Sequence, residues 1–194
     1  MNLPAVLQRY RWILLACAAI AAIVATAEFS MGRLAFGPDG AFGLWEGNIW
    51  SGEQSQRFAD PYSFTHVIHG FLFYGLLWLV ARRVPARYRL VAAVVLEGAW
   101  EILENSPIII NRYRAVTISL GYEGDSILNS LSDILMMALG FLLAWRWKLW
   151  VSVTAIVATE LVLLWWVRDN LTLNVIMLVY PLEAIRTWQS AGHR

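Results

Sequence analysis

The sequence predicts an all-α protein, a polytopic transmembrane helix bundle of five or six spans. Apolar residue types make up 59% of the chain and charged types 15%, whereas a soluble domain has roughly 45–50% and 25%. Several apolar stretches are long enough to cross a bilayer, and the polar residues inside them recur at helical spacing. With 194 residues, we expect a single transmembrane domain over 1–194, with one long outer-side loop at 30–62.

The composition also excludes several classes of protein. So apolar a chain does not stay disordered. Its net charge is +1, with 15 Lys and Arg against 14 Asp and Glu, so no basic surface is available for nucleic acid. One cysteine, Cys17, allows neither an intrachain disulfide nor a multi-cysteine zinc site. The partner that we expect is the lipid bilayer.

Five stretches approach the roughly 20 apolar residues that a membrane helix needs, and they run over 12–29, 63–81, 90–106, 127–145 and 149–167. A sixth, over 171–185, is short and contains Pro181, so it is either a short last span or a helix at the interface. The first stretch has two interpretations. Ala25, Thr26 and Ala27 fit the cleavage site of a signal peptide, whereas an apolar run that extends through Phe29 favours an uncleaved anchor.

Lys and Arg accumulate in cytoplasmic loops, and this bias predicts the orientation. With a cytoplasmic N-terminus and six crossings, ten of these residues lie inside, including four arginines between Arg82 and Arg89, and five lie outside. We therefore expect a multi-pass protein of the plasma (inner) membrane with a cytoplasmic N-terminus, and a cytoplasmic C-terminus if the sixth segment crosses. The aromatic residues of the outer loop indicate either a loop lying on the bundle or headgroups, or a lid over a site.

Polar residues inside spans are costly and need a reason. Three of the predicted helices carry such residues, and in each helix they lie on one face. The three sets are His66 and His69; Glu97, Glu101 and Glu104 beside Asn105; and Asp125, Asn129 and Asp133. From the rise of about 1.5 Å per residue, the histidines lie about 5 and 9 Å below the outer surface, Asn129 and Asp133 about 6 and 12 Å, and Glu104 and Glu101 about 9 and 14 Å. Glu97 is deeper, at about 20 Å. The three faces should therefore meet in one band near the outer surface.

Such a band admits three interpretations. It is a divalent metal site for Zn, Mn or Fe, with His66, His69, Glu101, Glu104 and Asp133 as ligands, since imidazole and carboxylate suit these ions. Alternatively it is a metal-free acid/base site, in which His66, His69, Glu97, Glu101, Glu104, Asn129 and Asp133 are the candidate catalytic residues. The third interpretation is structural, with polar residues that hold the helices together.

Other residues keep two interpretations each. Asp60 and Asp125 are helix caps or members of the site. Arg112 and Arg114 bind an anionic substrate headgroup or are simply exposed. Glu160, in the middle of its span, pairs with a neighbouring helix or marks a proton path.

Three further residues have one expected role each. Gly70 and Gly140 should permit close helix approach. Glu183 should be solvated near the inner surface.

Three segments carry a resemblance, namely Asp60 to Gly70, Glu97 to Asn105 and Gly124 to Asp133. They resemble an uncharacterised family of bacterial multi-pass inner-membrane proteins, over nearly the whole chain. That resemblance implies a membrane location and no activity. A weaker likeness joins Glu97 and Glu101 with Asp125, Asn129 and Asp133 to the VanZ-like membrane proteins, although His66 and His69 depart from that pattern.

The leading functional hypothesis is a membrane-embedded enzyme, metal-dependent or not, that acts on a lipid or cell-envelope substrate. The alternatives are a small proton-coupled transporter and a structural or accessory membrane protein. Polar residues that continue into the inner half would favour a transporter, and Glu97, Glu160 and Glu183 are the only hints of this in the sequence.

Overall fold

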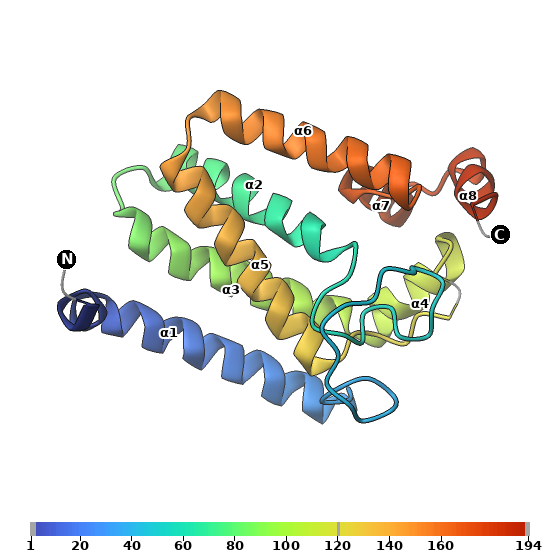
Figure 1. The fold of residues 1–194 in the computed structure, drawn as a ribbon, viewed down its shortest axis with the longest axis horizontal. Coiled ribbons are helices and arrows are strands. Elements are labelled where there is room, and N and C mark those ends of the chain that lie inside the picture. Colours follow the sequence, from blue (N-terminus) through green and yellow to red (C-terminus); the bar gives the residue numbers. More distant parts are fainter. Residues whose placement is uncertain (1–2, 120, 193–194) are drawn as a thin grey trace.

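A computed structural model describes residues 3–119 and 121–192. The described chain is helical, as the sequence predicts, with α1 (Leu3–Ser30), α2 (Ser63–Ala81), α3 (Ala86–Glu104), α4 (Pro107–Val116), α5 (Ile127–Arg146), α6 (Leu149–Trp166), α7 (Leu171–Val179) and α8 (Glu183–Ser190). The long helices run side by side, while α4, α7, α8 and the loop between α1 and α2 gather at one end (Figure 1). We call this end the loop end.

Four helices are long and apolar enough to cross a membrane, over Tyr10–Ser30, Ser63–Ala81, Ile127–Arg146 and Leu149–Trp166. The prediction of five or six spans is therefore not confirmed. Helix α3 has the same length as α2, 19 residues, but it carries two arginines and three glutamates. It nevertheless packs against α1, α2 and α5 inside the bundle.

The sixth segment does not form a membrane-spanning helix. Helix α7 has 9 residues and ends at Val179, so it is about 13 Å long against a bilayer core of about 30 Å. The chain then turns through Tyr180 and Pro181 into the short α8, which has a polar face. Arg112 of α4 donates from Nε to the Leu178 carbonyl at 2.9 Å, which holds α7 at the loop end. The alternative of an interfacial helix fits this arrangement.

The tightest packing joins α2 to α5, and glycine makes it possible. A Cβ atom on Gly70 would overlap the Met137 carbonyl and the Phe141 amide, and one on Gly140 would overlap the Val67 carbonyl. This confirms the expected role of both glycines. Beside this contact lies the apolar core of Val24, Ala93, Val94, Ile134, Met137 and Phe141.

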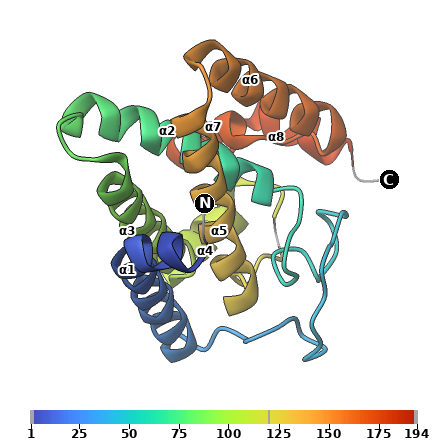
Figure 2. The same cartoon turned by 60° about the vertical axis from the view of Figure 1, so that its left-hand side comes forward.

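Helix α1 is a packed member of the bundle. It runs without a break through Ala25 and Ala27, and Val24 and Glu28, on either side of the expected cleavage site, are buried. Two views show α1 alongside α3 (Figures 1 and 2). This packing favours the uncleaved anchor. Helix α6 buries Ser152 and Leu163 and exposes Leu149, Val157 and Trp165, as a lipid-facing helix would.

Candidate functional site

The beginnings of α2 and α5 are set by local hydrogen bonds. Asp60 Oδ1 accepts from the backbone amides of Tyr62, at 2.7 Å, and Ser63, at 3.2 Å, so it binds the start of α2, although Tyr62 and not Asp60 is the N-cap residue. Asp125 is not a cap, because Ser126 is the N-cap of α5 and its Oγ accepts from the Asn129 amide at 3.2 Å. The side chain of Asp125 is therefore free to take other partners.

Two imidazoles of α2 converge on one carboxylate of α3. His66 Nδ1 lies 2.6 Å from Glu97 Oε1, and His69 Nδ1 lies 3.1 Å from each Glu97 oxygen. The two imidazole ring centroids are 5.0 Å apart. Glu97 has no exposed surface, so its charge depends on these two rings for compensation. We call His66, His69, Glu97, Glu101 and Asp133 the histidine–acid cluster.

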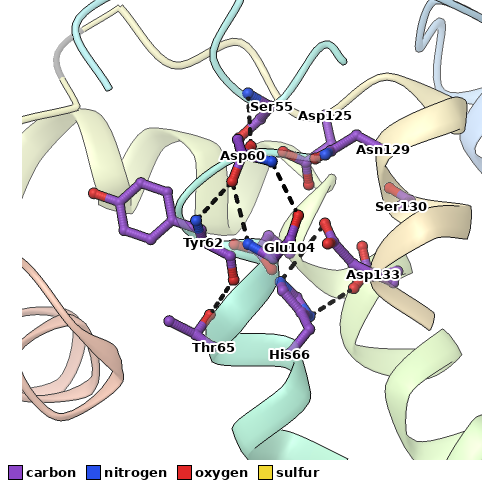
Figure 3. Close-up of polar contacts among 12 residues, drawn as sticks. Ser55, Asp60, Tyr62, Thr65, His66, Glu104, Asp125, Asn129, Ser130 and Asp133 are labelled. Carbon is purple, nitrogen blue, oxygen red and sulfur yellow. Dashed lines mark hydrogen bonds and ion pairs between the residues drawn. The ribbon is translucent and has the colours of Figure 1, made fainter. Parts of the chain in front are cut away.

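The other two acids of the cluster surround His66. Glu101 Oε1 is 3.5 Å from His66 Nδ1, and Asp133 Oδ2 of α5 is 3.7 Å from His66 Nε2. Figure 3 shows the His66 ring directed toward Asp133, with Glu104 above it. Neither carboxylate oxygen of Glu101 accepts a hydrogen bond, and Asp133 Oδ1 also lacks one. The cluster thus holds buried acceptors without donors, which is rare in folded proteins.

The predicted convergence of the three polar faces is confirmed, with a correction for Glu97. His69 Nδ1 lies 3.1 Å from Glu97 Oε1, whereas the sequence-based depths put Glu97 about 11 Å deeper than His69. Those depths follow from a span that starts at Leu90 and rises through a full core of about 30 Å, whereas α3 starts at Ala86. The contact places Glu97 at the level of His69, although the sequence-based ligand set omits it.

Glu104 and Asn129 lie nearer the loop end and have protein partners. Glu104 Oε1 accepts from the Tyr113 hydroxyl at 2.9 Å, and Asn129 Nδ2 donates to the Arg57 carbonyl at 2.9 Å. These bonds give both residues a role in holding α4 and the long loop against the bundle.

A second buried network lies beside the cluster, and sequence reasoning missed its member in α1. Asn105 Nδ2 lies 3.4 Å from Glu28 Oε1, 3.2 Å from Asp125 Oδ2 and 3.2 Å from Ser130 Oγ. Tyr122 donates to Asp125 Oδ1 at 2.9 Å. Glu28 has no exposed surface. Its signal in the sequence is a charge inside the first apolar stretch, the criterion that selected the other acids.

Burial governs the ionisation of the acids just outside the spans. Burial raises the pKa of Asp60 to about 7, despite the lowering effect of hydrogen bonds from backbone amides, chiefly that of Tyr62. Burial likewise raises the pKa of Asp125, against the lowering effect of its hydrogen bond from Tyr122. Near neutral pH the Asp60 carboxyl group can therefore hold or release a proton.

A cavity of about 1470 Å³ opens beside the cluster. Its polar lining includes Asp60, His66, His69, Glu104, Asp125, Asn129 and Asp133. Its apolar lining includes Phe73 and Leu76 of α2, Leu96 and Leu103 of α3, and Val175 and Leu178 of α7. A polar wall and an apolar wall thus face the same space.

The long loop lines the cavity at the loop end. The Ser126 and Ile127 amides donate to the carbonyls of Ser55, at 2.9 Å, and Leu34, at 2.8 Å, and Gln56 Nε2 donates to the Gly124 carbonyl at 2.8 Å. The loop therefore lies on the bundle and also lines the cavity. The expectation that the loop lies on the bundle is confirmed, and a lid over a site stays a prediction.

Several residues singled out in the sequence lie away from the cluster. Arg114 lines the cavity, but Arg112 points to the α7 backbone instead. Glu160 accepts from the amides of Leu171, at 3.0 Å, and Thr172, at 3.1 Å. Of its two expected roles, this is the pairing with a neighbouring helix. Glu183 begins α8 and is exposed, as expected of a solvated residue, while its position near the inner surface stays a prediction.

Comparisons with known proteins identify relatives but no activity. Residues 28–191 match the family described as "Protein of unknown function (DUF2585)". A UPF0314 protein of Sphingopyxis alaskensis is 51% identical over 190 residues, which cover 96% of this chain and 98% of the relative. A UPF0314 protein of Sinorhizobium fredii is 52% identical, over 94% of this chain and 93% of the relative. A UPF0314 protein of Paracoccus denitrificans is 56% identical, over 78% of this chain and 79% of the relative.

No solved structure matches this chain. The weaker likeness to VanZ-like proteins gains no support from these comparisons. The uncharacterised bacterial family expected from the three motifs is found, and the chain belongs to the UPF0314 family of proteins, matched by DUF2585.

Proposed function

We propose that this protein is a membrane-embedded enzyme, a hydrolase or transferase, that acts on a lipid with a polar headgroup. The observation that carries the proposal is the contact of His66 and His69 with Glu97 at the wall of a large cavity. An imidazole held by a carboxylate is a common general base or acid. Asp133 Oδ2 lies 3.7 Å from the other ring nitrogen of His66, too far for a hydrogen bond but near enough for its charge to act on that ring.

The apolar wall of the cavity supports a lipid as the substrate. Leu76, Leu96, Leu103 and Val175 line the cavity and are also exposed on the helix surface. In the bilayer these exposed faces contact acyl chains. A lipid can therefore place its headgroup beside the imidazoles while its chains stay in contact with the membrane.

A transporter has less support. A proton or solute path needs polar groups that continue toward the other end of the helices. Glu160 and Glu183, which suggested such a path, belong to the contacts and helices of the loop end.

The expected test uses purified protein in lipid nanodiscs with a total bacterial lipid extract. Mass spectrometry should detect a lipid species that the wild type consumes. Glu97→Gln, which keeps the size of the side chain, should abolish consumption. Lys148→Gln, between α5 and α6, should behave as the wild type. An unchanged extract, or equal consumption by Glu97→Gln, contradicts the proposal.

We further propose that the cavity faces outward from the plasma (inner) membrane. Arg82, Arg83, Arg87 and Arg89 lie at the end opposite the loop end, around the turn between α2 and α3. An excess of arginine in a short loop favours the cytoplasm. The N-terminus then lies in the cytoplasm, and the C-terminal helices lie outside because α7 does not cross.

Reporter fusions test this orientation. Alkaline phosphatase fused after Ser190 should be active, and fused after Arg83 it should be inactive. The reverse pattern would place the cavity on the cytoplasmic side.

A further inference from the structure

The histidine–acid cluster has the geometry of a metal centre. We infer that His66 Nδ1, His69 Nδ1 and a Glu97 oxygen bind one divalent transition-metal ion, with zinc as the best match. This inference stands on geometry and does not depend on a lipid being the substrate.

The spacing of the ligand atoms carries the first step. One ligand atom from each of the three residues lies within 4.8 Å of the others. The His66 and His69 nitrogens are 2.6 and 3.1 Å from Glu97 Oε1. A tetrahedral ion with bonds of about 2.0–2.2 Å separates its ligand atoms by about 3.3–3.6 Å. An ion therefore needs each imidazole nitrogen to move away from Glu97 Oε1 by about 1 Å or less.

The unpartnered carboxylate of Glu101 is the second, independent observation. Glu101 has no exposed surface, and neither of its oxygens has a hydrogen-bond donor. Leaving a buried carboxylate unpaired is costly. Its Oε1 is 3.5 Å from His66 Nδ1, close to the ligand separation of a tetrahedral site. A cation next to His66 would compensate this charge, either with Glu101 as a fourth ligand or through a bound water.

The partner of His66 is the third observation. A histidine that binds metal through one ring nitrogen usually donates its other N–H to a carboxylate. Asp133 Oδ2 lies 3.7 Å from His66 Nε2, on the side of the ring away from Glu97. Asp133 is thereby assigned as a positioning residue, although the sequence suggested it as a ligand.

Two imidazoles and one carboxylate with an open fourth position are the ligands of catalytic zinc sites. His69 lines the cavity, so the fourth position can be reached from it. When bound, the ion would lower the pKa of a water molecule or polarise an ester or phosphoryl oxygen. Those are the reactions that the hydrolysis of a lipid headgroup requires.

Metal analysis of the full-length protein in detergent tests this inference. After incubation with Zn²⁺ and removal of free metal, the wild type should retain about one zinc per chain. Glu97→Gln and His69→Ala should each retain less than a tenth of that amount. Glu183→Gln, an acid-to-amide change on α8, is the matched control and should bind as the wild type does. Size-exclusion profiles identify variants that do not fold.

Two further measurements separate a metal centre from a structural cluster. Asp133→Asn should keep the stoichiometry but weaken zinc affinity about 10–100-fold. Co²⁺ in place of Zn²⁺ should produce the visible absorption of a tetrahedral ion in the wild type, and none in Glu97→Gln.

Less than a tenth of an equivalent of Zn²⁺, Mn²⁺ and Fe²⁺ in folded wild type would overturn the inference. So would equal zinc binding by folded Glu97→Gln. If the folded protein retains no metal yet consumes a lipid, the proposed function stands and the metal centre fails. If metal binds and no lipid is consumed, the opposite holds.

Discussion

Glu160 of α6 and Glu101 of α3 are both acids in long helices, yet their surroundings differ. Glu160 accepts from the first two backbone amides of α7, while Asn170 accepts from the third, that of Leu173. The free amides at the start of α7 are thus satisfied. Glu101 is buried and its oxygens have no donor. An acid inside an apolar helix therefore does not by itself mark a functional site, and the partners supplied by the fold decide its role.

Glu160→Ala tests the structural side of this comparison and should have the largest effect on folding. It leaves the amides of Leu171 and Thr172 without their acceptor, which costs about 1–3 kcal/mol. We expect a lower melting temperature in detergent and proteolytic cleavage near α7, with unchanged zinc binding. Glu160→Gln, which keeps one acceptor oxygen, should lower the melting temperature less than Glu160→Ala does. An unchanged melting temperature for Glu160→Ala would remove the assigned role of Glu160.

Glu101→Gln tests the other side and should act in the opposite direction. In protein stripped of metal, the amide removes a buried carboxylate that lacks a partner, so stability should rise by up to about 1 kcal/mol. In zinc-loaded protein the same change should lower the melting temperature, because the metal loses a compensating charge. Thermal unfolding with and without chelator measures both. A loss of stability in both states would show that Glu101 has a purely structural partner.

Asp60 lies between these extremes, because its oxygens have donors but burial raises its pKa from an ordinary 3.8 to about 7. The folded protein then keeps this proton to a higher pH than the unfolded chain. Its stabilising contribution is full below about pH 4 and is lost as the pH rises through about 7. Asparagine at this position has no such titration.

The melting temperature of Asp60→Asn, relative to the wild type, should therefore rise by several degrees between pH 5 and pH 8. Asp39→Asn is a suitable control, because the pKa of the exposed Asp39 is lowered by its hydrogen bond from Arg57. A constant difference between Asp60→Asn and the wild type across this range would contradict the raised pKa.

Helical spacing was enough to predict which faces of α2, α3 and α5 carry the polar residues, since a period of 3.6 residues follows from backbone geometry alone. The prediction was less accurate where helix ends mattered. Counting depth from an assumed start at Leu90 misplaced Glu97, and the apolar content of 171–185 suggested a span that Tyr180 and Pro181 interrupt. Helix ends depend on local caps and tertiary contacts, which hydropathy does not contain.

The sequence by itself determined that this protein is helical and rich in membrane-type segments, and that three helices bear aligned histidines and acids. Tertiary structure alone decided which of those acids are compensated. Glu160 and Asp60 accept from backbone amides, Glu104 accepts from Tyr113, and Glu97 contacts two imidazoles. The reason is that compensation of a buried charge depends on atoms within a few ångströms, and those atoms come from segments distant in the chain.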